Sequence, residues 1–230
     1  TDKNDAVFES ADIKIKGEFK HPRVTGIPIE NCGVIANYKK STSQLTVWSS
    51  TQIPHLLRDA LSDSLQISVN QIRVVAPDVG GGFGIKMQAL PEEIIISYLA
   101  RELLQPIKWT QDRMENIKAS FHSRDALVEA ELSAKADGTI VGLRAKAICD
   151  VGAYNAFPLT AGLEPFTIGS ALAGPYDFEH YSFEGYAIAT NKCPMGAYRG
   201  VGFVLGPMVM ENLLDQLALK TGLDPAFVRK

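Results

Sequence analysis

Four glycines between residues 80 and 84 constrain the fold of this chain more than any other feature. They lie in the stretch VVAPDVGGGFGIKMQALPEE, residues 74–93, which runs from a short apolar segment into a helical pattern. Glycine loses more conformational freedom on folding than any other residue, so a glycine cluster indicates a geometric requirement. The sequence therefore predicts a strand-to-helix loop in which either a tight turn or a closely approaching ligand excludes side chains.

The spacing of these glycines does not match the common phosphate-binding loops. Gly80, Gly82 and Gly84 lack the G-x-G-x-x-G phase of dinucleotide-binding folds. Lys86 is not followed by the serine or threonine of a P-loop. The setting between a strand and a helix still suits anion binding by backbone amides. A tight turn without a ligand is the alternative.

Strands and helices are predicted in an irregular order, which favours an α+β fold with mixed sheets and packed helices. A long β-hairpin is expected over residues 126–154, because two alternating segments flank the turn sequence Asp137-Gly138. Residues 1–30 are expected to be irregular. The other expected strands cover 45–50, 71–78, 106–110 and 181–190, and the expected helices cover 54–65, 90–104 and 205–222.

A boundary near residue 120 divides the chain into two expected subdomains. Residues 1–120 would form an α+β subdomain with the GGGFG loop. Residues 121–230 would form an α+β subdomain with the long hairpin, the GAYRG loop and a C-terminal helix. With 230 residues, of which 46% are hydrophobic, the chain is long enough to bury a sizeable core.

The charge and the cysteine content narrow the class of protein. The net charge is -3 at pH 7 and the basic residues are scattered, which argues against nucleic acid or a membrane surface as a partner. Cys32, Cys149 and Cys193 are far apart and share no metal-binding spacing, so we expect a reducing compartment and no metal held by these side chains. The sequence has no apolar run of transmembrane length and no signal-peptide core, and we therefore expect a cytoplasmic protein.

A second stretch, NKCPMGAYRGVGF at residues 191–203, again places glycines around a cation. Arg199 lies between Gly196 and Gly200, which provide no side-chain cover. Its guanidinium group and the neighbouring amides can therefore face an anion. The alternative is a surface loop that carries a solvated arginine.

Gln52 is a third candidate, in the stretch SSTQIPH at residues 49–55. It lies between the end of a predicted strand and the start of a predicted helix, where its side-chain amide could donate to a bound oxygen. The alternatives are an N-terminal helix cap and an exposed amide.

The segments SSTQ, GGGFG and GAYRGVG, in this order, resemble the molybdenum-binding subunit of the xanthine dehydrogenase, aldehyde oxidase and carbon monoxide dehydrogenase large-chain family. DVGAY and ENLLDQLA extend the resemblance over nearly the whole chain. The resemblance implies a fold of the molybdenum-cofactor-binding type and a molybdopterin cofactor whose dithiolene holds the metal. Gln52 would hydrogen-bond an oxygen on the metal. The backbone amides of Gly82, Phe83 and Gly84 would approach the oxygens of the metal centre, and Arg199 would lie with its backbone against the cofactor.

Several positions depart from the family pattern. Met87 stands where purine-oxidising members have a glutamate, and Val201 stands where they have a stacking phenylalanine. Residues 164–165 offer no counterpart to a substrate-binding arginine of those members. These departures argue against a purine substrate and place Met87 and Val201 in the expected substrate pocket. Gly200 stands where the copper-containing carbon monoxide dehydrogenases have a cysteine, so we expect no molybdenum–copper centre.

The general base of the family, a glutamate in a G-x-G-E loop near the end of a much longer chain, has no counterpart between Gly202 and Lys230. We therefore expect a truncated or split chain, inactive alone, that contributes to a molybdenum hydroxylase acting on an aldehyde or heterocycle with water as oxygen donor. Its partners would be the C-terminal molybdenum-binding part and subunits with iron–sulfur clusters and FAD. Apolar surface left uncovered would favour homo-oligomers. The alternative is a non-catalytic relic or scaffold of the same family without cofactor.

Overall fold

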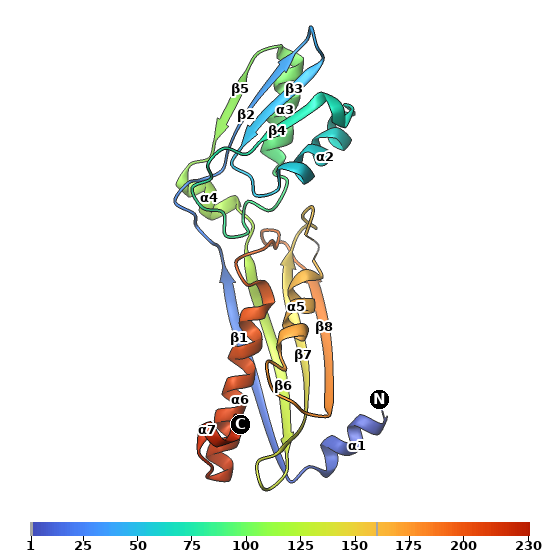
Figure 1. The fold of residues 1–230 in the computed structure, drawn as a ribbon, viewed down its shortest axis with the longest axis vertical. Coiled ribbons are helices and arrows are strands. Elements are labelled where there is room, and N and C mark those ends of the chain that lie inside the picture. The colour runs from blue at the N-terminus through green and yellow to red at the C-terminus, as the bar shows by residue number, and fades with distance from the viewer. Residues whose placement is uncertain (1, 160) are drawn as a thin grey trace.

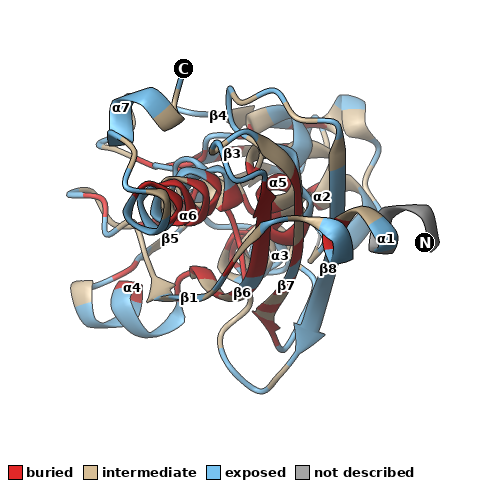
Figure 2. Ribbon diagram, turned by 90° about the horizontal axis from the view of Figure 1, so that it is seen from below, coloured by how far each residue is buried: buried red, intermediate tan, exposed pale blue. Residues whose placement is uncertain are grey.

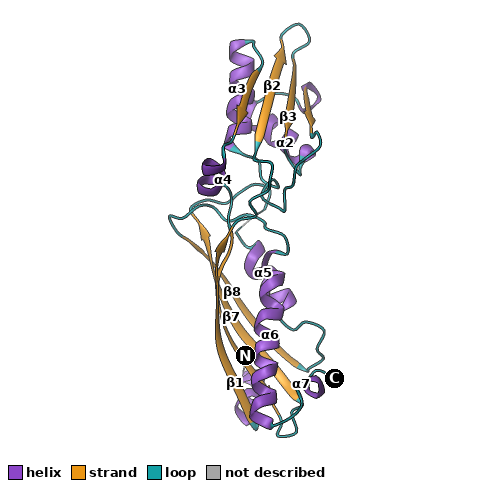
Figure 3. Ribbon diagram, turned by 90° about the vertical axis from the view of Figure 1, so that its left-hand side faces the viewer, coloured by secondary structure: helices purple, strands orange, loops and turns teal. Residues whose placement is uncertain are grey.

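The computed structural model describes residues 2–159 and 161–230, and it shows two lobes that follow one another along the long axis of the molecule (Figure 1). Each lobe contains a four-stranded sheet. Helices cover one face of each sheet (Figure 3). The α+β architecture with mixed sheets and packed helices, predicted from the sequence, is confirmed.

The upper lobe of Figure 1 is built on the sheet order β4-β3-β2-β5. Strand β3 pairs parallel with β4, and β2 pairs antiparallel with both β3 and β5. The first helix of this lobe begins at Pro54, whose fixed φ suits a first helical position, and it buries Leu57, Leu61 and Leu65 against the sheet. The elements of the lobe are β2 (Gly33–Lys39), β3 (Gln44–Ser49), α2 (Pro54–Leu65), η1 (Val69–Gln71), β4 (Ile72–Val75), α3 (Pro91–Leu103) and β5 (Ile107–Thr110).

The lower lobe is built on the sheet order β1-β6-β7-β8, in which β8 pairs parallel with β7 and the other pairs are antiparallel. Figure 2 shows that the buried residues gather on the long helix α6 and on the strands that it covers. Gly222 ends this helix in the left-handed conformation. The elements of the lobe are α1 (Asp2–Ser10), β1 (Ile13–Val24), β6 (Ser123–Ala134), β7 (Ile140–Gly152), α5 (Leu163–Ala171), β8 (His180–Ala189), η2 (Val201–Val204), α6 (Leu205–Thr221) and α7 (Pro225–Val228).

The expected hairpin is confirmed as the antiparallel pair β6–β7, and every other strand and helix predicted from the sequence is also found. The prediction that residues 1–30 are irregular is wrong. They contain α1 and the twelve-residue strand β1, which pairs with β6 along its length. The alternation of Ile13, Ile15 and Phe19 fits a strand, but its pairing partner lies far along the chain, where no local signal indicates it.

The two expected subdomains, residues 1–120 and 121–230, stay a prediction. Strand β1 lies in the lower lobe with β6, β7 and β8, whereas residues 33–110 supply the upper sheet. Helix α4 (Arg113–Ala119) lies at the junction of the lobes (Figure 1). Within the described residues, the helices are all too short or too polar to cross a membrane.

Candidate functional site

The two glycine-rich loops meet at the junction of the lobes. The backbone N–H of Arg199 donates to the carbonyl oxygen of Phe83 across 2.8 Å. The guanidinium carbon of Arg199 also lies 5.4 Å from the centre of the Phe83 ring, a cation–π distance. The Phe83 side chain remains 41% exposed, so this contact leaves one surface of the loop uncovered.

Gln52 lies between β3 and α2 and contacts the first of these loops. Its Oε1 accepts the N–H of Gly84 at 2.9 Å, and its own backbone N–H donates to the carbonyl oxygen of Lys86 at 2.9 Å. Its Nε2 forms no hydrogen bond with any described residue, so the fixed amide can donate outward. The alternative that Gln52 caps helix α2 is wrong, because Ile53 is the N-cap residue and no side chain caps this helix.

The contact between the loops explains why side chains are excluded. Gly84 has a φ of 99°, and a Cβ added to it would lie 2.8 Å from the carbonyl oxygen of Ala197 in the second loop. A Cβ on Gly82 would collide with Oε1 of Gln52. Gly84 is therefore required by the packing of the chain on itself, whereas a side chain on Gly82 would have to displace the end of the Gln52 side chain.

Several hydrogen-bond donors on these loops are unpaired. Among the described residues, none accepts a hydrogen bond from the amides of Gly82, Phe83 and Gly200. The guanidinium group of Arg199 likewise forms no hydrogen bond or ion pair within the described part of the chain. Buried amides are nearly always paired, so the unpaired N–H of the buried Gly82 indicates an absent partner. Amides, one side-chain amide and one guanidinium group together suit an oxygen-rich anionic ligand, and the residues present thus fit an oxygen-bearing metal cofactor.

A carboxylate that sequence reasoning missed holds the start of the first loop. Oε2 of Glu30 accepts both the N–H of Gly80 and the ammonium group of Lys86, each at 2.7 Å. Burial would raise the pKa of Glu30, but these hydrogen bonds outweigh burial and hold its pKa below the ordinary value. The side chain of Lys86 is only 1% exposed, which is rare for a lysine without a partner. No sequence signal links Glu30 to Lys86, because the fold alone brings them together.

The expected substrate-pocket residues lie directly beside the loops. The N–H of Met87 donates to the carbonyl oxygen of Gly84 at 3.0 Å, and the N–H of Val201 donates to that of Tyr198 at 2.7 Å. Both side chains are half-buried. Their role in a substrate pocket stays a prediction.

The described residues contain no group of three or more His, Cys, Asp and Glu side chains arranged to hold a metal ion. Cys32 and Cys149 are buried, and burial raises the pKa of Cys32 to about 11 and that of Cys149 to about 12. Both thiols are therefore protonated near neutral pH and are poor metal ligands.

Known proteins resemble this chain over its whole length. The sequence pattern of the molybdopterin cofactor-binding domain matches residues 1–230. The nicotine 6-hydroxylase large subunit of Paenarthrobacter nicotinovorans is 37% identical over 98% of this chain and 28% of its own length. The carbon monoxide dehydrogenase large chain of Hydrogenophaga pseudoflava is 36% identical over the same shares. The crystal structure of quinoline 2-oxidoreductase from Pseudomonas putida 86 superposes with a TM-score of 0.93, with 39% identity over 97% of this chain and 28% of that one.

The fold and the paired loops, together with these likenesses, define a domain of the type found in molybdenum hydroxylases. The chain belongs to the molybdopterin cofactor-binding domain family. It spans 28% of the length of the relatives named above.

Proposed function

We propose that this chain supplies part of the molybdopterin cradle of a hydroxylase that oxidises an aldehyde or an aromatic heterocycle, with water as the oxygen donor. The hydrogen bond from Arg199 to Phe83 is the observation that carries the proposal, because it brings the unpaired donors of two distant loops to one place. The names of the relatives, which include a nicotine hydroxylase and a quinoline oxidoreductase, agree with a heterocyclic substrate.

The residues of the chain would act as donors towards oxygen. When bound, the cofactor supplies a metal that accepts electrons from the substrate. Gln52 holds its amide by accepting from Gly84 and turns its Nε2 outward as a neutral donor. The amides of Gly82 and Phe83 add two further donors that need no reorganisation, and Arg199 adds a positive charge.

The substrate side of the site is uncharged in this chain. Met87 and Val201 offer apolar surface, which suits a neutral carbonyl compound or heterocyclic ring better than a purine. We assign the general base to sequence outside this chain, because the G-x-G-E motif is absent from Gly202–Lys230. We assign the iron–sulfur and FAD groups to partner subunits, an assignment that the family resemblance supports.

The test is the molybdenum and pterin content of the purified protein. The chain is produced alone and together with its neighbouring open reading frames, in cells that make the cofactor. We expect one molybdenum per complex and little or none on the chain alone, as measured by elemental analysis and by the fluorescence of the oxidised pterin. A correctly folded complex without molybdenum would overturn the proposal and favour a scaffold without cofactor.

A further inference from the structure

Two consecutive residues of β6 adopt the left-handed backbone conformation. Arg124 has a φ of 71° and Asp125 a φ of 58°. Neither is glycine, and L-residues with side chains avoid this conformation because of steric strain. The pairing of β6 with β1 leaves out Asp125 and Pro22, which stand opposite each other, without a change of register. Such strain persists only where surrounding contacts maintain it, and it often marks a functional site.

The side chain of Arg124 reaches into the second glycine loop. Its Nη1 donates to the carbonyl oxygen of Tyr198 at 3.2 Å, and its Nη2 donates to that of Arg199 at 3.0 Å. Its guanidinium carbon lies 5.1 Å from the centre of the Tyr198 ring. The side chain of Arg124 is 4% exposed, so its guanidinium group contacts the protein interior and not the solvent. Arg124 therefore fixes the peptide group that contains the N–H of Arg199, which donates to Phe83, and the peptide group that follows it.

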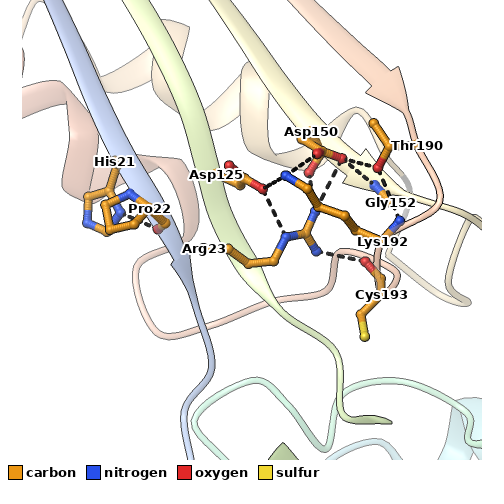
Figure 4. A network of polar contacts seen from close by, with 9 residues as sticks. All are labelled: His21, Pro22, Arg23, Asp125, Asp150, Gly152, Thr190, Lys192 and Cys193. Atoms are coloured by element: carbon orange, nitrogen blue, oxygen red, sulfur yellow. Dashed lines mark hydrogen bonds and ion pairs between the residues drawn. The ribbon is translucent and has the colours of Figure 1, made fainter. Parts of the chain in front are cut away.

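The side chain of Asp125 holds the other end of the same segment. Its Oδ2 accepts from Lys192 Nζ at 2.8 Å and from Arg23 Nε at 3.0 Å (Figure 4). Arg23 also donates to the carbonyl oxygen of Cys193 at 2.7 Å. The segment 192–199 is thus held at its start by Asp125 and at its end by Arg124.

A buried carboxylate offsets the charge of Arg124 without competing for its donors. Oε1 of Glu164 lies 3.9 Å from Nη1 of Arg124, too far for a hydrogen bond, while Oε2 accepts from Ser123 Oγ at 3.2 Å. Oε1 has no hydrogen-bond partner among the described residues. Burial raises the pKa of Glu164 and lowers that of Arg124. The attraction between the two groups opposes this effect of burial, and the hydrogen bonds of the Arg124 cation go to the two loop carbonyls and to Oγ of Ser123.

We infer that the strained pair Arg124–Asp125 positions the segment 192–199 for cofactor binding, with Arg124 as the positioning residue for the Arg199 loop. The inference rests on the proposed function, because it names what sets the shape of one half of the proposed cradle. Neither side chain needs to touch the cofactor. Their effect passes through the backbone of the loop.

The variants Arg124→Ala and Arg124→Lys test this inference in the complex described above. Arg144→Ala is the matched control, because Arg144 also pairs with a carboxylate, Glu131 at 2.8 Å, and lies 5.0 Å from the ring centre of Phe8, within the lower sheet. Hydrogen exchange of residues 196–204 measures the order of the loop, and the molybdenum content measures the cradle. Thermal unfolding measures overall stability, so that a general loss of stability can be distinguished from a change in loop order or in molybdenum content.

We expect Arg124→Ala to speed exchange in residues 196–204 by about tenfold or more and to lower the molybdenum content several-fold. Arg124→Lys should restore part of the exchange protection and part of the molybdenum content, since an ammonium group reaches one carbonyl at a time. Guanidinium added to Arg124→Ala should restore the exchange protection. Arg144→Ala should lower the unfolding temperature but leave both readouts unchanged.

The inference would be overturned if residues 196–204 of Arg124→Ala exchanged as slowly as in the wild type. It would also be overturned if Arg144→Ala accelerated their exchange as much as Arg124→Ala does. Faster exchange with full molybdenum content would overturn the role in cofactor binding. If the wild-type complex itself held no molybdenum, the proposed function would fail, while the exchange measurement would still decide whether Arg124 fixes the loop.

Discussion

The backbone nitrogen of Arg199 and the carbonyl oxygen of Phe83 lie 2.8 Å apart, and this hydrogen bond joins the two glycine loops into one structural unit. The backbone of Ala197, two residues earlier, lies so close to Gly84 that no Cβ fits between them. The shape of the first loop therefore depends on the second. A change that separates them should affect both the stability and the proposed cradle.

Gly84→Ala tests this dependence. The added methyl group would meet the carbonyl oxygen of Ala197 at 2.8 Å, and alanine disfavours a φ of 99°. We expect the free energy of unfolding to fall by roughly 2–4 kcal/mol, the sum of strain and overpacking. Urea denaturation measures this loss. The larger Gly84→Val should also prevent molybdenum binding, and normal metal content in that variant would count against the cradle.

Gly222→Ala is the control for Gly84→Ala. Gly222 also has a positive φ, 72°, but nothing lies within 4 Å of an added Cβ. Only the backbone penalty should appear there, about 1 kcal/mol. Equal losses in the two variants would show that the contact with Ala197 contributes nothing.

Gln52→Glu separates the two functions of the Gln52 side chain. A carboxylate can still accept the N–H of Gly84, but it cannot donate outward. We expect wild-type stability with turnover slowed by roughly 10²-fold, the usual effect of removing one donor from an oxyanion site. Gln52→Ala should slow turnover in the same way and should also destabilise the loop by about 1 kcal/mol. An unchanged rate in both variants would remove Gln52 from the site.

Local signals in the sequence predicted much of the fold. Helix α2 begins at the proline that the sequence marks, and α3 begins with Pro91 followed by two acidic residues. The turn Asp137-Gly138 predicted the β6–β7 hairpin. Each of these signals depends only on residues close together in the sequence, so it can be recognised without knowing which distant segments pack against it.

The parts that the sequence could not predict depend on contacts between distant residues. Strand β1 has a clear partner only once β6 is in place. The pair of Glu30 with Lys86 and the contacts of Arg124 have no sequence spacing of their own, because the fold creates them. The family resemblance gives Gln52, Phe83 and Arg199 their expected roles, and the fold brings their segments together.

Breaking the ion pair between Glu30 and Lys86 should have unequal effects on its two partners. The Lys86 side chain is 1% exposed, whereas that of Glu30 is 39% exposed. Glu30→Ala would leave a buried ammonium group without a counter-charge and would also remove the acceptor of the Gly80 N–H, so we expect a loss of roughly 3 kcal/mol or more. Lys86→Met should cost clearly less, because water can reach Glu30 and the thioether fills the space.

Chemical denaturation of both single variants and of the double variant measures this asymmetry. We expect the double variant to be more stable than Glu30→Ala alone, since removing the lysine removes the unpaired buried charge. A larger loss in Lys86→Met than in Glu30→Ala would contradict the explanation.

Glu93 should make stability depend on pH between its unfolded and folded pKa values. It lies at the start of α3 with 2% exposure, and its two oxygens accept from Ser49 Oγ at 2.5 Å and from the N–H of Leu90 at 2.8 Å. Burial raises its pKa from 4.5 to about 7, despite these hydrogen bonds. Between these values the folded chain binds more protons than the unfolded chain, so stability falls as pH rises.

Glu93→Gln removes this dependence, because an amide carries no ionisable proton. We expect the variant to gain stability relative to wild type by roughly 3 kcal/mol between pH 4.5 and pH 7.5, because most of the difference between a pKa of 4.5 and one of about 7 takes effect in this range. Urea denaturation at several pH values gives the difference directly and cancels the titration of other groups. Glu92→Gln is the control, since the neighbouring charge is the smallest cause of the shift and its removal should change the slope only slightly. A constant difference between Glu93→Gln and wild type across this range would show that Glu93 ionises as freely in the folded protein as in the unfolded chain.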